Sequence, residues 1–374
     1  MFIKLVLAIF LAITSSAFAI TKKNGLSYIS MPVHKRSDLE KRDLVQGTTE
    51  TDLPQSFYYT TIQVGSNKDD VALMVDTGSW ASNILTPNVT CSHGNCTKFG
   101  NYDPTKSTSA KIIGTSHIEN FGYNYIYTGT TVIDDVYFNG VKIPNYLFAS
   151  VYNNTAWPAG LFGFSKPPKS ETNMSISWAA RNANLINQAA YSMYLSTIDG
   201  KPGGIILGAI DYGKINGDLH WANLTGHNVG GFIDSFEING HNVSIGRDFT
   251  ADTGGSYFNL KEAEYEQFLD SLPNDPQNPR GSKTINFDLL KGKTSKLKIN
   301  GAVLEFPLDA IIHPGDSGPH ARIIVRQNDQ VQLGSFFFRY LYFAVSLEKE
   351  AIGWGVTNDG SNSFLGSFPS SYHL

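Results

Sequence analysis

The tripeptide Asp-Thr-Gly occurs twice in the chain, at 76–78 and again at 252–254. Each copy follows an apolar stretch, at 71–75 in the first case and at 249–251 in the second. At average residue usage, a chain of this length contains one Asp-Thr-Gly roughly one time in ten. Two copies in matching contexts therefore indicate an internal duplication rather than chance.

Asp76 and Asp252 are the candidate catalytic residues. Two carboxyl groups brought close together share one proton, because neighbouring negative charges disfavour ionisation of both. One group then acts as an acid and the other as a base, which is the combination that water-mediated cleavage of an amide needs. Glycoside hydrolysis also uses two carboxyl groups, but it does not need the symmetry of two Asp-Thr-Gly turns.

The duplication extends beyond the tripeptides. An apolar segment containing a glycine follows each of them, Leu-Phe-Gly-Phe at 161–164 and Val-Gln-Leu-Gly at 331–334. We expect two related lobes, an N-terminal lobe at 43–222 and a C-terminal lobe at 223–374. Each lobe contributes one carboxylate, so the active-site cleft is expected between the lobes.

Composition favours a mostly β fold. Glycine and aromatic residues are frequent and only 17% of the residues are charged, which is typical of many short strands and turns. Alternating segments at 57–65, 204–208 and 321–325 predict strands. The best helical signals lie at 175–190 and 261–269. We therefore predict two β-barrel-like lobes with few helices.

The first 19 residues have the features of a signal peptide. Lys4 provides the positive end, an apolar run follows at 5–13, and 17–19 (Ala-Phe-Ala) has the small-x-small form of a cleavage site. An ordinary buried helix is the alternative. No later stretch reaches 18 consecutive apolar residues, and the polar C-terminal segment does not resemble a lipid-anchor signal. We expect a secreted, extracellular protein that does not associate with a membrane.

Residues 20–42 are predicted to be a pro-segment. They carry six Lys or Arg residues against two acidic ones, and they end in Lys41-Arg42, a dibasic site of the kind that secretory proteases cut. The rest of the chain, 43–374, carries 22 basic and 31 acidic residues. We expect the basic pro-segment to associate with this acidic body before processing. A disordered, solvated leader is the alternative.

Six Asn-x-Ser/Thr sequons agree with secretion and are candidate glycosylation sites. They are Asn88, Asn95, Asn153, Asn173, Asn223 and Asn242. The only cysteines, Cys91 and Cys96, can close a small loop as a disulfide in an oxidising compartment, with free thiols as the alternative. These residues do not supply the ligands of a metal site, so we expect neither a metal nor a cofactor. No basic patch for nucleic acid and no heptad repeat stands out, and we expect a monomer.

In these motifs the chain resembles the pepsin-like aspartic proteases, most closely the secreted yeast candidapepsins. Four blocks between about 57 and 355 carry the resemblance. They are 62–67 (Ile-Gln-Val-Gly-Ser-Asn) leading to 75–79 (Val-Asp-Thr-Gly-Ser), Cys91 and Cys96 followed by 99–104 (Phe-Gly-Asn-Tyr-Asp-Pro), 203–212 (Gly-Gly-Ile-Ile-Leu-Gly-Ala-Ile-Asp-Tyr), and 333–339 (Leu-Gly-Ser-Phe-Phe-Phe-Arg). The resemblance implies an aspartic endopeptidase, made as a zymogen, that cuts extended peptides or proteins at acid pH.

The resemblance also implies a role for each residue of the two tripeptides. Asp76 and Asp252 would hold a water molecule between them, without a metal or a covalent intermediate. One carboxylate would remove a proton from this water as it attacks the scissile carbonyl, and the other would protonate the carbonyl oxygen. Thr77 and Thr253 would hydrogen-bond across the lobe interface and keep the two loops rigid.

Three neighbours of the carboxylates receive supporting roles from the resemblance. Gly78 and Gly254 would let backbone amides approach the carboxylates, which a Cβ atom would obstruct. Ser79 would hydrogen-bond the outer oxygen of Asp76 and help to keep this group ionised. The pair of cysteines would match the small disulfide loop of the first lobe.

Family members carry a β-hairpin, the flap, with a tyrosine over the cleft. The corresponding region here is 121–129, but counting back from Gly129 does not reach a single tyrosine. We take Tyr123 as the flap candidate, with Tyr125 and Tyr127 as alternatives. All three tyrosines can also be ordinary strand aromatics.

The chain departs from the family pattern around the carboxylates. Asn83 occupies the place of a tryptophan that usually supports the flap, and Gly255 replaces a Thr or Ser whose hydroxyl would support Asp252. Ser335 stands where an aspartate usually follows the glycine of the last block, and another expected aspartate is replaced near Ser346. Residues that support a site without touching the substrate can change its activity 10- to 100-fold, by analogy with metal sites. The alternative function is therefore a catalytically weak or inactive glycoprotein that binds peptides or proteins.

Overall fold

The structure of the chain is a computed structural model. It describes residues 21–23, 26–35, 58–92, 94–122, 124–196, 202–224, 228–313, 316–358, 360 and 362–372. The predicted signal peptide and the dibasic site Lys41-Arg42 lie outside these ranges. Within them, no helix has the length and apolar character needed to cross a membrane.

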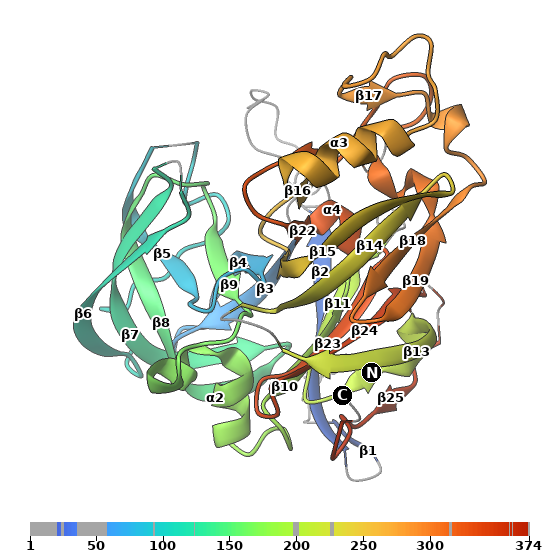
Figure 1. Cartoon of the computed structure of the whole chain (residues 1–374). Helices are drawn as coiled ribbons and strands as arrows, with labels where there is room; N and C mark the ends of the chain where they lie inside the picture. Colours follow the sequence, from blue (N-terminus) through green and yellow to red (C-terminus); the bar gives the residue numbers. More distant parts are fainter. Residues whose placement is uncertain are drawn as a thin grey trace, which may run out of the picture.

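Most of the described chain is β-structure (Figure 1). The larger of its two main sheets has 14 strands. Its strands lie in the order β13-β24-β23-β10-β11-β2-β3-β4-β9-β5-β8-β7-β6, and β1 pairs with β2. In chain order they are β1 (Thr21–Lys23), β2 (Leu26–Lys35), β3 (Tyr58–Val64), β4 (Asp69–Asp76), β5 (Asn83–Cys91), β6 (Lys111–Asn120), β7 (Ile126–Phe138), β8 (Val141–Asn154), β9 (Gly160–Gly163), β10 (Ala190–Tyr194), β11 (Gly203–Leu207), β13 (Ile215–Asn223), β23 (Leu341–Ser346) and β24 (Ala351–Thr357).

The second main sheet has seven strands in the order β19-β18-β14-β15-β22-β16-β21. They are β14 (Gly230–Ile238), β15 (His241–Asp252), β16 (Phe258–Leu260), β18 (Thr294–Ile299), β19 (Ala302–Pro307), β21 (Val325–Gln327) and β22 (Gln332–Gly334). Two short pairs complete the β-structure, β12 (Ile210–Asp211) with β25 (Leu365–Gly366) and β17 (Thr284–Ile285) with β20 (Ala321–Arg322). Figure 1 shows β5 to β9 on one side of the molecule and the second sheet on the other.

Helices are short in the described ranges. The α-helices are α2 (Ile176–Asn182), α3 (Glu262–Ser271) and α4 (Ser335–Phe338), and the 3₁₀ turns are η1 (Lys169–Met174), η2 (Tyr212–Lys214), η3 (Phe287–Leu289) and η4 (Leu308–Ile311). The mostly β prediction is therefore confirmed, and α3 agrees with the helix expected at 261–269. The helix expected at 175–190 is wrong beyond Asn182, because Asn184 adopts the left-handed conformation (φ 57°) and ends the helix before β10.

The strands that carry the two aspartates are built alike. β4 ends at Asp76 and pairs in parallel with β9, so that Asp76 lies opposite Gly163. β15 ends at Asp252 and pairs in parallel with β22, so that Asp252 lies opposite Gly334. We call β3 to β9 the first half and β14 to β22 the second half. The two apolar segments noticed in the sequence are the parallel partners of the aspartate strands.

Part of the predicted pro-segment is a central strand. β2 lies between β11 and β3, with five residue pairs to β11 and two to β3. Its side chains alternate, and Ile29, Met31 and Val33 are buried while Pro32 is exposed. The Thr60 hydroxyl also donates to the Pro32 carbonyl at 2.9 Å. Residues 26–35 are therefore not the solvated leader that we considered as an alternative.

The core continues from one half into the other through aromatic rings. Successive ring centroids lie between 4.8 and 6.3 Å apart in the row Phe162, Phe164, Tyr191, Phe343, Trp354 and Phe249. The row passes from β9 through β10, β23 and β24 to β15. Burial of these large aromatic side chains stabilises the packing of the strands that carry the two aspartates.

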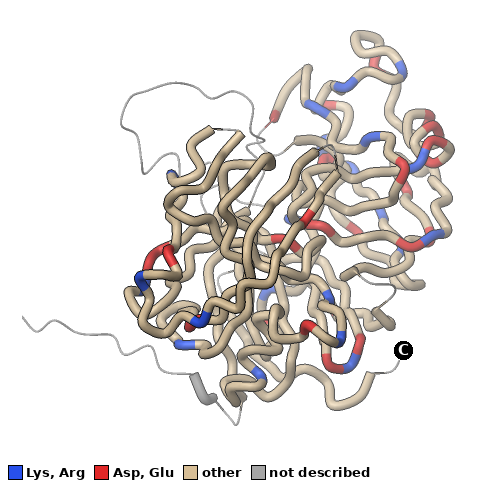
Figure 2. Tube along the Cα trace, turned by 90° about the vertical axis from the view of Figure 1, so that its left-hand side faces the viewer, with Lys and Arg blue, Asp and Glu red and all other residues tan. Residues whose placement is uncertain are grey.

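Charged residues are interspersed along the described chain rather than gathered by sign (Figure 2). Around α3, for example, the Arg280 guanidinium lies 2.7 Å from Glu266 and 2.6 Å from Asp270. Exposed ion pairs of this kind stabilise a fold only slightly.

Candidate active site

The structure brings the two predicted catalytic carboxyl groups together. Asp76 and Asp252 are in hydrogen-bond contact with each other at the ends of β4 and β15. We call 76–79 the first Asp loop and 252–255 the second Asp loop. A Cβ atom on Gly78 would lie 2.7 Å from the Asp252 Cγ atom, and one on Gly254 would lie 2.6 Å from the Asp76 Cγ atom. Only glycine at these two positions leaves room for the opposite carboxyl group.

Crossed hydrogen bonds join the two loops. The Thr77 hydroxyl donates to the Ala251 carbonyl at 2.6 Å and accepts the Thr253 N–H at 3.0 Å. The Thr253 hydroxyl donates to the Val75 carbonyl at 2.8 Å and accepts the Thr77 N–H at 3.1 Å. Both threonines are fully buried. Each loop is thus completed by backbone atoms of the other half, and the spacing of the carboxyl groups is fixed.

Asp76 has surroundings that favour its protonated form. Burial, the negative charge of Asp252 and the hydrogen bond between the two groups raise the pKa of Asp76 well above its ordinary value. Hydrogen bonds from the Ser79 hydroxyl and from the Gly78 N–H, at 2.7 Å, oppose this rise. The net effect is a raised pKa of Asp76, so the pair retains a proton above the ordinary range of an aspartate.

Asp252 has more hydrogen-bond donors than Asp76. The N–H groups of Gly254 and Gly255 donate to its Oδ1 atom at 2.8 and 3.0 Å, and the Gln332 side-chain amide donates to its Oδ2 atom. Burial raises the pKa of Asp252, and these donors together with the hydrogen bond to Asp76 oppose the rise. Hydrogen bonds to a carboxylate favour its ionised form, and Asp252 accepts three of them from outside the pair.

Gln332 was not among the residues predicted for the site. It lies in β22, and its backbone pairs with Asn259 of β16. Its segment was noticed in the sequence only as an apolar stretch with a glycine. The signal that marks it is a single polar residue at the position that Leu161 occupies in the first half.

The sequence profile of the eukaryotic aspartyl protease family matches residues 57–356. The chain belongs to the eukaryotic aspartyl protease family. The predicted family is therefore confirmed.

Relatives of this chain carry the names of candidapepsins and secreted aspartic proteases. The chain is 27% identical to Candidapepsin-2 of Candida parapsilosis, over 90% of this chain and 82% of the relative. It is 29% identical to Secreted aspartic protease 5 of Candida albicans, over 87% and 82%. It is 26% identical to Candidapepsin-1 of Candida albicans, over 79% and 80%. The similarity is distant but spans most of each chain.

The flap candidate Tyr123 lies outside the described residues, in the sequence between β6 and β7, the paired strands of the hairpin. Of the two alternatives, Tyr127 is fully buried and its hydroxyl donates to the Ala159 carbonyl at 2.7 Å. Tyr125 is exposed at the tip, and its ring lies 5.8 Å from that of Trp157. Tyr127 is thus a core residue of this hairpin.

Asn83 links the hairpin to the strand that follows the first Asp loop. It is fully buried, and its side-chain nitrogen donates to the Glu119 carboxylate of β6 at 2.5 Å. The His117 Nε2 atom lies 3.6 Å from the same carboxylate. A polar contact therefore connects β5 to β6 at the place where the family pattern has a tryptophan.

The remaining departures are structural in this family member. Ser335 is buried, and its backbone N–H donates to the Gly255 carbonyl at 2.7 Å. The Ser346 hydroxyl accepts hydrogen bonds from the Gln188 side chain at 2.6 Å and from the Lys349 N–H at 3.1 Å. Ser335 is thereby joined to the second Asp loop, and Ser346 to the turn that follows β23.

Cys91 and Cys96 form the expected disulfide. Among the sequon residues, Asn153 is half-buried in β8. The other five are exposed, namely Asn88, Asn95, Asn173, Asn223 and Asn242. Asn95 accepts hydrogen bonds from the N–H and the hydroxyl of Thr97, the third residue of its own sequon. Glycosylation at these positions stays a prediction.

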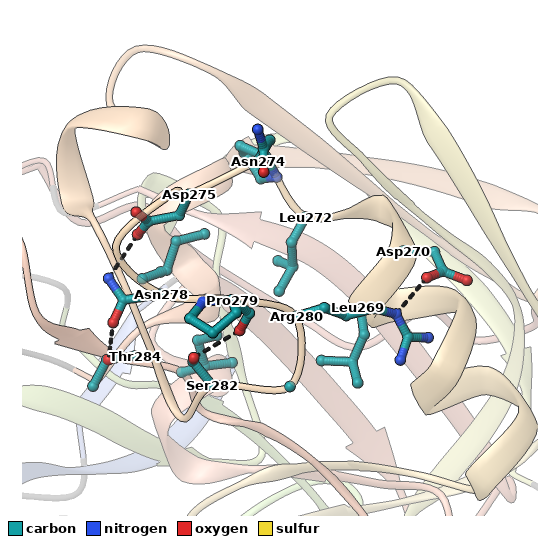
Figure 3. Close-up of a pocket in the computed structure, with 14 residues that line it drawn as sticks. Leu269, Asp270, Leu272, Asn274, Asp275, Asn278, Pro279, Arg280, Ser282 and Thr284 are labelled. Carbon is teal, nitrogen blue, oxygen red and sulfur yellow. Dashed lines mark hydrogen bonds and ion pairs between the residues drawn. The ribbon is translucent and has the colours of Figure 1, made fainter.

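A pocket of this protein lies beside α3 and does not include either Asp loop (Figure 3). Its polar side chains are bonded to one another. The Asn278 side chain donates to Asp275 at 2.8 Å and accepts from the Thr284 hydroxyl at 2.7 Å, and Arg280 donates to Asp270. These hydrogen bonds hold the loop after α3 in its conformation. In the described ranges, no group of three or more His, Cys, Asp and Glu side chains is placed to hold a metal ion.

Proposed function

We propose that this protein is a secreted aspartic endopeptidase that hydrolyses peptide bonds at acid pH. The observation that carries the proposal is the pairing of Asp76 and Asp252 on two symmetric loops with unequal donors around the two carboxyl groups. A pair that shares one proton supplies an acid and a base at the same place.

The unequal donors assign the two roles. A water molecule between the carboxyl groups attacks the scissile carbonyl carbon while Asp252, the ionised group, accepts one of its protons. Asp76 donates its proton to the carbonyl oxygen, and a tetrahedral diol forms. Transfer of a proton to the amide nitrogen then breaks the C–N bond and releases a carboxylic acid and an amine.

The shared proton sets the direction of the pH dependence. Because the pKa of Asp76 is raised, the pair still holds its proton above the ordinary range of an aspartate. Activity falls at higher pH, when Asp76 also ionises, and at lower pH, when Asp252 becomes protonated. The result is a bell-shaped profile with its maximum in the acid range.

Further parts of the proposal come from the sequence and from the relatives. The relatives are named as secreted aspartic proteases and candidapepsins, which supports extended peptides and proteins as substrates. A signal peptide at 1–19 and a pro-segment that ends at Lys41-Arg42 would deliver the protein as a secreted zymogen. We propose that the mature protein acts as a monomer without a metal or cofactor.

Cleavage of denatured haemoglobin between pH 3 and pH 7, with and without pepstatin, tests the proposal. The full chain is expressed with its own predicted signal peptide, and the secreted protein is collected from the medium. We expect acid-dependent cleavage that pepstatin blocks and that Asp76→Asn reduces by at least about 10³-fold. Asp218→Asn, the same change at an exposed residue of β13, is the matched control and should cleave like the parent. Undiminished cleavage by the Asp76→Asn variant would exclude the mechanism, and pepstatin binding without cleavage would support the binding-only alternative.

A further inference from the structure

We propose that Gln332 is a positioning residue that holds Asp252 in its ionised form, in the place of a hydroxyl group that the second Asp loop lacks. The inference rests on the proposed function and deepens it, because it names what supports the base. Gln332 acts through Asp252 and has no direct contact with the bond that is cleaved.

The two halves carry different residues at equivalent positions. In the first half, the Ser79 hydroxyl hydrogen-bonds Asp76. Leu161 of β9 pairs with Met74, which precedes Asp76 by two residues. In the second half, Gly255 occupies the position of Ser79 and Gln332 the position of Leu161. The donor to the carboxylate has thus moved from the loop to the neighbouring strand.

Gly255 and Gln332 depend on each other sterically. A Cβ atom on Gly255 would overlap with the Gln332 Nε2 atom and would lie 3.0 Å from the Asp252 Oδ2 atom. The Gln332 amide therefore fills the space of a side chain at 255 and reaches the same carboxylate oxygen that such a side chain would face. A glutamine at 332 and a hydroxyl-bearing side chain at 255 therefore cannot both fit unless the structure rearranges.

Two further residues fix the direction of the Gln332 amide. The Asn259 Nδ2 atom donates to the Gln332 Oε1 atom at 3.0 Å, and the Arg326 Nε atom donates to the Asn259 Oδ1 atom at 2.8 Å. The Arg326 side chain can only donate hydrogen bonds and an ionised Asp252 can only accept them. Both ends of this series of hydrogen bonds therefore require the same orientation of the Gln332 amide. The Gln332 NH₂ group is thereby held toward Asp252, and a positive charge lies at the far end.

Gln332→Leu is the first variant to measure, because leucine is the residue at the equivalent position of the first half. We expect kcat to fall about 10- to 100-fold, the effect of losing a hydrogen bond to a charged group. KM should stay within about twofold of the parent value, because the residue does not touch the substrate. Since the lost donor favours the ionised form of Asp252, the acid limb of the kcat profile should move to higher pH.

The variant Gly255→Ser/Gln332→Leu tests the exchange directly. It gives the second half the Ser and Leu pair of the first half, so we expect most of kcat and the original acid limb to return. Gly255→Ser alone should be impaired, because its side chain overlaps with Gln332. A double variant more active than either single variant is an outcome that loss of packing alone does not produce.

Gln327→Leu, the same change at an exposed residue of β21, is the matched control, and thermal unfolding verifies that every variant is folded. An unchanged kcat and acid limb in Gln332→Leu would overturn the inference, as would a double variant no better than Gln332→Leu. If Asp252→Asn also keeps full activity, it is the proposed function that fails. An inactive Asp252→Asn beside an unaffected Gln332→Leu rejects the positioning role alone.

Discussion

The two halves of this protein share a frame and differ in what surrounds it. In both, a parallel pair of strands carries an aspartate opposite a glycine, and a threonine reaches across to the other half. The first half supports its carboxyl group with the Ser79 hydroxyl, whereas the second half uses the Gln332 amide. The backbone geometry of a duplicated site is thus kept, while a side chain with the required donor can come from a different strand.

A second pair of equivalent residues shows the same division. Asn83 and Asn259 each pair with the partner strand of their half, at Leu161 and at Gln332. The Asn83 side chain donates outward to Glu119 of the hairpin, but the Asn259 side chain donates inward to Gln332. The same residue type therefore serves the hairpin in one half and the carboxylate in the other.

The shared frame predicts equal effects from the two threonines. Thr77→Val and Thr253→Val each leave one buried N–H and one buried carbonyl without a partner, at about 1–3 kcal/mol for each group. We expect each variant to lower the free energy of unfolding by roughly 2–6 kcal/mol in denaturant titrations. Thr61→Val, at an exposed position of β3, is the control and should change little. Markedly unequal losses would show that the two loops are not equivalent.

The different surroundings predict unequal effects from the two aspartates on stability. The raised pKa of Asp76 means that the folded protein binds this proton more tightly than the unfolded chain, so stability falls as the pH rises through the raised pKa. Asp76→Asn should therefore raise the free energy of unfolding at pH 7, by about 1–3 kcal/mol. Asp252→Asn should raise it less, because Asp252 already has three donors outside the pair.

Thermal unfolding at pH 4 and pH 7 measures this difference. The loss of stability between the two pH values should be smallest in Asp76→Asn, and Asp218→Asn should retain the parent's loss. If Asp252→Asn is the more stable variant at pH 7, the order of the two pKa values is reversed.

The two donors should also act on opposite limbs of the pH profile. Ser79→Ala removes a donor that favours the ionised form of Asp76, so the pKa of Asp76 rises and the basic limb moves to higher pH. We expect a loss of about 2- to 10-fold in kcat, the effect of losing a hydrogen bond to a neutral group. Ser92→Ala, at an exposed position, is the control for haemoglobin cleavage between pH 3 and pH 7. A shift of the acid limb instead would mean that Ser79 supports the base.

Much of this could be predicted because it lies in local sequence. Asp76 and Asp252, with their threonines and glycines, form repeated tripeptides, and the family resemblance follows from them. Gln332 could not be predicted in the same way, since its partner Asp252 is 80 residues earlier and no spacing rule joins them. The missing hydroxyl at Gly255 was visible, but only the register between β15 and β22 shows which residue replaces it.

The strand β2 was hidden by a different cause. Its basic flanks and the dibasic site at Lys41-Arg42 are typical of a removable leader, and this pattern dominated the interpretation. The period-two alternation of Ile29, Met31 and Val33 was present in the sequence, yet partners as distant as β11 cannot be inferred from a short alternating segment. The pairing of strands is a long-range property that local patterns leave open.

The crossed threonine bonds also set the moment during synthesis at which the site can first exist. Thr77 and Thr253 are 176 residues apart, and each needs backbone atoms of the other's loop. At translation rates of about 5–20 residues per second, the first loop leaves the ribosome roughly 9–35 s before the second. For that interval the nascent chain carries one aspartate without its partner. A chain that ends before the second Asp loop therefore lacks the paired carboxyl groups, and the site is complete only after both halves have folded.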